Sequence, residues 1–287
     1  MANNLKAALW MLGAIASFSA MAVAGREVSQ WLDTFEIMTY RSLVGIVVLW
    51  TILTLTGQWR QVTRRSMGTH VVRNAAHFTG QNLWFYAMTS IPLAQVFALE
   101  FTSPIWVVLL SPLILGEPLT RLRVLSVLAG FVGILIVARP SPDTISPGLI
   151  AAASSAVFFA LSVMYTRLLT RSETVLCIMF WLTLIQAVFG IVFSAWDGDM
   201  VAPSAQTWPW LVLIGLAGLL AHYCLTSALA VAPATVVVPI DFVRLPTIAI
   251  VGMLLYGEAL GQGIRDFHSP MAAAGFSHGG MHRLFPP

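Results

Sequence analysis

The sequence predicts an all-α polytopic membrane protein made of two similar five-helix units that enter the membrane in opposite orientations. The chain is 58% hydrophobic and 9% charged, whereas globular domains are about half apolar and a quarter charged. Its apolar residues gather in segments of about 18–25 residues, the length that a helix needs to cross about 30 Å of hydrocarbon. This composition excludes a soluble domain.

An internal repeat is the third observation behind this fold class. Adding 141 to the residue number takes Glu100 to Asp241 and Phe18 to Phe159. Glu100 lies inside an otherwise apolar segment of membrane length, and Asp241 lies in the matching segment of the second half. A duplicated membrane unit with a matched acidic residue at depth is typical of transporters whose site lies between the two halves.

The first half is expected to supply five spans. Arg41 lies near the start of the second span, where it either snorkels to the interface or faces a cavity. The Gly57–Arg73 connection is the most basic stretch and is therefore expected to be cytoplasmic. The expected spans are Leu5–Ala24, Glu36–Thr56, Thr69–Ser90, Leu93–Leu115 and Leu122–Ala138.

The third span is too polar for contact with lipid alone. Under the repeat, its Gln81 and Asn82 correspond to His222 and Tyr223 in the eighth span, so polar side chains recur at one depth in both halves. Hydrogen bonding between helices and contact with a substrate are alternative explanations. The polar and aromatic residues of the third span that are candidates for a site are His77, Gln81, Asn82 and Trp84.

The fourth span should be interrupted beside its acid. Pro104 follows Glu100 by four residues. Because proline has no N–H, the Glu100 carbonyl loses its usual helical partner, and we expect a kink there. Broken backbone beside a buried carboxylate predicts an ion or proton site.

The ninth span, Thr235–Tyr256, repeats this arrangement with Asp241 and Pro246, and adds Arg244 one helical turn beyond the acid. The i,i+3 spacing allows a neutralising ion pair between Asp241 and Arg244. The other interpretation is direct contact of both with a substrate or coupling ion. It is favoured because Glu100 has no basic residue at such a spacing.

The second half is expected to supply four spans and an irregular tail. Arg265 and Asp266 in the tail would each cost roughly 2.5–3.5 kcal/mol at the centre of a span, so we predict nine spans, with the tail emerging on the periplasmic side. The sixth and seventh spans are Pro147–Leu168 and Val175–Ala195. The predicted units are residues 1–139, a linker at 140–147, residues 148–260, and a tail at 261–287.

The basic residues also predict an orientation. Lys6 and most of the arginines between spans fall on one side of the membrane, which places the N-terminus in the cytoplasm. A unit of five spans ends on the opposite side from where it began, so the second unit enters upside down. The two units therefore form an inverted-topology repeat.

The whole pattern resembles a known family. Each half has an acidic segment that ends in Gly-Glu, and the run Ala98–Arg123, ALEFTSPIWVVLLSPLILGEPLTRLR, is the most specific part. From Leu5 to Glu258 the chain resembles the EamA-like family of the drug/metabolite transporter (DMT) superfamily. The resemblance implies a ten-helix inner-membrane carrier with a central cavity, and substrates that range over amino acids, nucleosides, vitamins and drugs. The tail departs from the pattern because it lacks an apolar tenth span.

The sequence therefore predicts a secondary-active transporter that moves a small polar or zwitterionic metabolite across the bacterial inner membrane by alternating access, with proton coupling as an option. The alternative is a non-transporting or truncated membrane protein that acts as a scaffold. The expected partners are a small-molecule substrate and the lipid bilayer, and a homodimer is an open alternative. The candidate substrate- or ion-binding residues are Glu100, Asp241, Arg244, His77, Gln81, Asn82, His222, Tyr223, Arg41 and Trp84.

Other functional classes have little support in the sequence. Motifs of hydrolases and clusters of Cys and His at metal-ligand spacing are missing from the spans, so we expect neither an enzyme nor a metal or cofactor. The net charge of +3 comes mainly from arginines at the ends of spans. Such charge indicates orientation in the membrane, and nucleic acid is not an expected partner.

Overall fold

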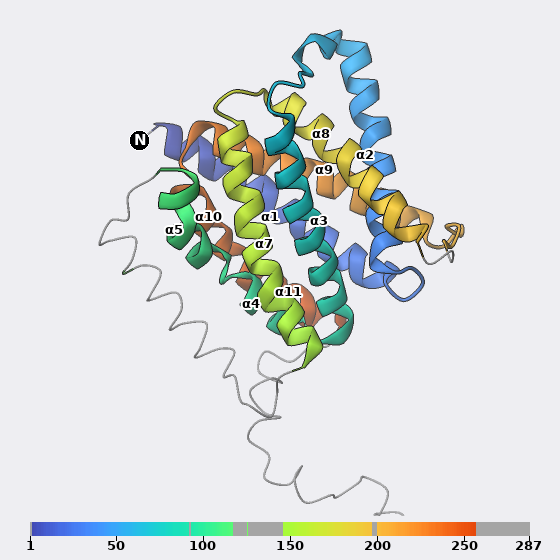
Figure 1. Ribbon diagram of the computed structural model, residues 1–287. Coiled ribbons are helices and arrows are strands. Elements are labelled where there is room, and N and C mark those ends of the chain that lie inside the picture. The colour runs from blue at the N-terminus through green and yellow to red at the C-terminus, as the bar shows by residue number, and fades with distance from the viewer. Residues whose placement is uncertain (1, 92, 117–124, 126–145, 197–199, 257–287) are drawn as a thin grey trace, which may run out of the picture.

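The computed structural model shows a bundle of helices (Figure 1) and describes residues 2–91, 93–116, 125, 146–196 and 200–256. Every regular element within these ranges is a helix. Six helical stretches in the described part are long and apolar enough to cross a membrane. The prediction of an all-α polytopic fold is confirmed.

The first half contains three long helices and one broken one. The second helix begins with a capping box, in which Asp33 Oδ1 accepts from the Glu36 amide at 2.8 Å and Glu36 Oε2 accepts from the Asp33 amide at 2.9 Å. It ends at Gly57, whose φ of 65° suits glycine. The helices are α1 Ala2–Val28, α2 Thr34–Thr56, α3 Met67–Ser90, α4 Leu93–Glu100 and α5 Ser103–Ile114, with a short 3₁₀ turn η1 at Gln58–Gln61.

The second half repeats this order. Ser146 and Thr174 cap its first two helices, because their hydroxyl oxygens accept from the amides of Leu149 and Cys177, each at 3.2 Å. The helices are α7 Pro147–Leu169, α8 Val175–Ser194, α9 Trp208–Val231, α10 Ala234–Ile240, the 3₁₀ turn η3 Asp241–Val243, and α11 Arg244–Tyr256.

Both spans that carry a matched acid are broken at that acid. In the first half, α4 ends at Glu100, the chain turns through two residues, and Pro104 lies in the first turn of α5. In the second half, α10 ends at Ile240 and the tighter η3 begins at Asp241. The interruption expected beside Glu100 is thus observed, and 3₁₀ geometry inside a helix often marks a functional hinge.

The two halves pack reciprocally. Helix α1 lies along α9, and α3 lies along α7. Because the repeat relates α1 to α7 and α3 to α9, these are the same contact made twice with the halves exchanged. The broken helices behave in the same way, since α4 contacts α11 and α5 contacts α10. The two breaks therefore meet where the broken helices cross.

Three predictions concern residues that the structure mostly does not describe. They are the fifth span Leu122–Ala138, the linker at 140–147 and the tail at 261–287. The count of nine spans, the boundaries of the two units and the periplasmic tail therefore stay predictions.

Candidate functional site

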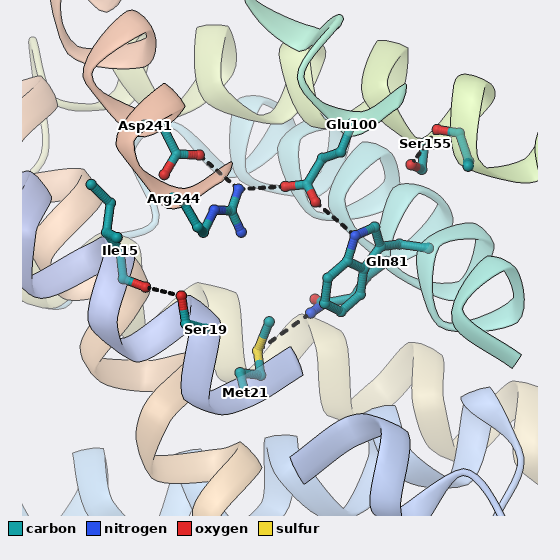
Figure 2. Close-up of polar contacts among 10 residues, drawn as sticks. Ile15, Ser19, Met21, Gln81, Glu100, Ser155, Asp241 and Arg244 are labelled. Carbon is teal, nitrogen blue, oxygen red and sulfur yellow. Dashed lines mark hydrogen bonds and ion pairs between the residues drawn. The ribbon is translucent and has the colours of Figure 1, made fainter. Parts of the chain in front are cut away.

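The matched acids share one arginine where the broken helices cross. Arg244 Nη2 donates to Glu100 Oε1 at 2.5 Å and to Asp241 Oδ2 at 2.6 Å (Figure 2). Glu100 comes from α4 in the first half, whereas Asp241 and Arg244 come from η3 and α11 in the second. Glu100 has no basic residue one helical turn away in its own segment, and its basic partner comes instead from the other half of the chain.

Glu100 has a second polar partner. Trp84 Nε1, on α3, donates to Glu100 Oε2 at 2.7 Å, so both carboxylate oxygens of Glu100 are engaged. The side chains are sequestered, since 8% of the Glu100 surface and 4% of the Arg244 surface are exposed. Together, Glu100, Asp241 and Arg244 carry two negative charges and one positive charge.

Aromatic rings surround the shared guanidinium. Arg244 Cζ lies 5.1 Å from the ring centroid of Phe18 and 5.4 Å from those of Phe97 and Phe101. Rings at these distances attract a cation through their quadrupoles. Asp241 Oδ1 and Arg244 Nε are buried without a hydrogen-bond partner among the described residues, so the group keeps unused capacity for a ligand or a water.

A cavity of about 90 Å³ adjoins this group. Its walls combine the rings of Phe18, Phe101 and Phe159 with polar side chains from both halves. Most of the predicted site residues line it, namely His77, Gln81, Trp84, Glu100, His222, Asp241 and Arg244.

Two histidines meet in the middle of the cavity wall. The rings of His77 on α3 and His222 on α9 are perpendicular, with centroids 4.6 Å apart. His77 Nε2 and both nitrogens of His222 lack a hydrogen-bond partner among the described residues. Gln81 donates to Met21 Sδ at 3.8 Å (Figure 2), and its Oε1 has no hydrogen-bond partner in the part of the chain that the structure describes. These polar atoms are available to a ligand.

The structure does not bring three predicted residues into this cavity. Asn82 and Tyr223 each follow a cavity residue by one position, which turns them about 100° around the helix. Asn82 donates to a carbonyl of its own helix, and Tyr223 is 37% exposed and packs edge-on against Trp10. Arg41 lines a smaller neighbouring cavity that shares His222 with the main one.

Arg73 is a cavity residue that sequence reasoning missed. It belongs both to the predicted third span Thr69–Ser90 and to the end of the basic connection Gly57–Arg73, and it counts there as an orientation signal. In the structure α3 begins at Met67, and Arg73 is 2% exposed and lines the cavity. A signal was present in the sequence. Arg73, His77, Gln81 and Trp84 follow one another at spacings of four, four and three residues, which puts them on one helix face.

Helices broken at buried charges, in a bundle with two reciprocally packed halves, define a membrane transporter of the inverted-repeat class. Comparison with known proteins names the family. The chain belongs to the EamA-like transporter family, whose sequence profile matches residues 5–139 and 146–263. The predicted family is thereby confirmed, and the protein is a multi-pass membrane protein of a family that transports small metabolites.

Named relatives cover most of the chain. It is 32% identical to a riboflavin transporter of Brucella anthropi, over 87% of this chain and 89% of the relative. It is 29% identical to a riboflavin transporter of Vibrio cholerae, over 89% and 86% of the two chains. An S-adenosylmethionine uptake transporter of Rickettsia bellii is 24% identical, over 87% and 84%. A crystal structure that is 18% identical covers 88% of this chain and 89% of its own with a TM-score of 0.70, so it has the same fold.

Proposed function

We propose that the protein carries a small polar or zwitterionic metabolite across the bacterial inner membrane by alternating access, with its N-terminus in the cytoplasm. The observation that carries the proposal is the Arg244 guanidinium shared between Glu100 and Asp241. It joins the two halves of the repeat at the crossing of their broken helices, beside a cavity lined from both halves. In inverted-repeat carriers, the two halves move relative to each other around such a central site.

The charges of this group support coupling to a proton or another cation. Two carboxylates and one guanidinium leave one negative charge, and an unbalanced charge is costly at membrane depth. A bound proton or cation removes that imbalance. Because the Arg244–Glu100 contact connects the halves, neutralising Glu100 weakens that connection. Loading the site would thus be linked to movement of the halves.

The cavity walls support a substrate that contains a flat ring. Phe18, Phe101, Phe159 and Trp84 offer aromatic faces between the polar groups. Riboflavin and S-adenosylmethionine, for which relatives are named, both contain a flat heteroaromatic ring, so they are the first substrates to test. Pockets for ligands of this size usually enclose about 300–1,000 Å³. The cavity must therefore widen from about 90 Å³ when such a molecule enters.

Flux into proteoliposomes tests the proposal. The purified chain is reconstituted, and uptake of radiolabelled riboflavin, S-adenosylmethionine, nucleosides and amino acids is measured with and without an inward proton gradient. Uptake of at least one solute above that of empty liposomes is expected. If no solute enters while the protein is folded and inserted, the scaffold alternative replaces the transporter.

A further inference from the structure

Two arginines are buried in the bundle with no carboxylate partner among the described residues. Arg73 on α3 is 2% exposed and Arg41 on α2 is 6% exposed. Ion pairs within the described ranges involve Arg244 but neither of these two. Arg73 lines the main cavity and Arg41 the smaller neighbouring one. Buried charges in proteins are usually paired, so two such guanidinium groups without a carboxylate call for an anion.

The bonds of Arg73 hold its guanidinium in place but leave donors free. Nε donates to Thr166 Oγ1 on α7 at 3.0 Å, and Nη1 donates to Asn74 Oδ1 at 3.1 Å. Both acceptors are neutral. Nη2 has no acceptor among the described residues, and Arg73 and Thr166 both line the cavity. A guanidinium fixed in this way presents the planar fork that matches an oxyanion.

Arg41 is even less satisfied. Its one hydrogen bond within the described part runs from Nη1 to Met38 Sδ at 3.6 Å, and a thioether is a weak acceptor. Gly218 on α9 leaves room for the guanidinium, because an added Cβ there would lie 3.2 Å from Arg41 Nη2. The charges of Arg41 and Arg73 act on each other and on the rings of His77 and His222.

The two ends of the cavity therefore carry opposite charges. On α3, Arg73 and Trp84 are eleven positions apart, which corresponds to about 16 Å along a helix. The Trp84 end adjoins Glu100 and Asp241 and carries the excess negative charge. The Arg73 end carries excess positive charge, with the two histidines between the ends.

We infer that Arg73, reinforced by Arg41, forms a subsite for an anionic oxygen group, a carboxylate or a phosphate, on the transported molecule. This inference rests on the proposed function and narrows the substrate class to metabolites that carry an anionic oxygen group together with a polar or cationic group. S-adenosylmethionine carries a carboxylate and a sulfonium, whereas riboflavin gains an oxyanion only as its 5′-phosphate.

Binding of small anions tests the subsite without requiring transport. Equilibrium binding of radiolabelled phosphate and of radiolabelled acetate is measured on the full chain in lipid nanodiscs, at constant ionic strength. We expect saturable binding of at least one of them, and the stronger one identifies the group. Arg73→Gln should weaken that binding at least ten-fold, Arg41→Gln should weaken it less, and the exposed control Arg65→Gln should leave it unchanged.

A second variant covers the case in which Arg73→Gln does not fold. Thr166→Val keeps the shape of the side chain but removes the acceptor for Arg73 Nε, so anion binding should weaken several-fold in a protein that thermal unfolding still shows to be folded. If neither anion binds saturably to the wild type, the inference is wrong. Equal binding by the wild type, Arg73→Gln and Thr166→Val overturns it as well.

Uptake separates this inference from the proposed function. If the wild type carries neutral and anionic solutes alike and Arg73→Gln does not change their ratio, the subsite is wrong while the transporter stands. If nothing is carried but phosphate or acetate binds and depends on Arg73, the proposed function fails while the anion site stands.

Discussion

The two broken helices share one architecture but differ in their polar partners. The repeat places Ser103 in the first half where Arg244 stands in the second, and Leu225 where Trp84 stands. As a result, both oxygens of Glu100 are bonded, one to Arg244 and one to Trp84. Asp241 bonds to Arg244 through one oxygen only, and its other oxygen has no partner among the described residues.

This difference teaches how a symmetric scaffold makes an asymmetric site. The duplicated backbone brings two acids to one crossing, and a single arginine then serves both. Glu100 is held between the halves, whereas Asp241 belongs to the same half as the arginine. The two acids should therefore respond differently to mutation, although they occupy equivalent positions.

Removing the shared cation should have the largest effect. Arg244→Gln leaves Glu100 and Asp241 as unpaired buried carboxylates, which typically costs about 3–5 kcal/mol. Thermal unfolding in mild detergent should show this loss, and uptake should disappear. Arg244→Lys keeps the charge on a side chain one atom shorter than the one whose Nη2 reaches both acids. Its stability and uptake should lie between those of the wild type and Arg244→Gln. Unfolding of Arg244→Gln at the wild-type temperature would contradict the shared ion pair.

Removing the extra partner of Glu100 should have a smaller effect. Trp84→Phe keeps an aromatic ring but deletes the N–H that donates to Glu100, and hydrogen bonds to charged groups contribute about 1.5–3 kcal/mol. Trp106→Phe is the matched control, because that ring is 37% exposed and makes no hydrogen bond among the described residues. Equal losses of stability in both variants would mean that the hydrogen bond from Trp84 to Glu100 contributes no stability beyond that of the packed ring.

A buried carboxylate outside the crossing should matter least. Glu173 Oε2 accepts from Thr63 Oγ1 at 2.6 Å, between α7 and α8. Burial raises the pKa of Glu173, but hydrogen bonds, chiefly from Thr63, lower it further, so the pKa lies below its ordinary value of 4.5. Its contribution to stability is therefore present at neutral pH and lost as pH falls through that lowered pKa.

The variant Glu173→Gln tests this contribution of Glu173 to stability. It should unfold at a slightly lower temperature than the wild type at pH 7, and the difference should vanish in acid while uptake at pH 7 stays unchanged. If the difference in unfolding temperature grows as pH falls, the pKa of Glu173 is not lowered in the folded protein.

Much of the fold could be predicted from the sequence because lipid restricts spans to long apolar helices and the repeat fixes their pairing. The break beside Glu100 followed from Pro104. The partner of Glu100 could not be predicted, because spacing along one helix says nothing about a residue 144 positions away. Arg73 was missed for a different reason: it lies within the predicted third span, but it also ends the most basic stretch of the sequence, where basic residues are interpreted as an orientation signal.

Proton movement during uptake tests the central claim most directly. Liposomes that hold a pH-sensitive dye report proton entry when substrate is added outside, and radiolabel reports solute entry in the same sample. Glu100→Gln leaves the neutral pair Asp241–Arg244 in place, so the protein should still fold and exchange solute across the membrane. We expect wild-type protein and Glu173→Gln to acidify the lumen with solute entry, and Glu100→Gln to exchange solute without acidification. Equal acidification by Glu100→Gln and the wild type would contradict the role of the shared arginine and its acids in coupling.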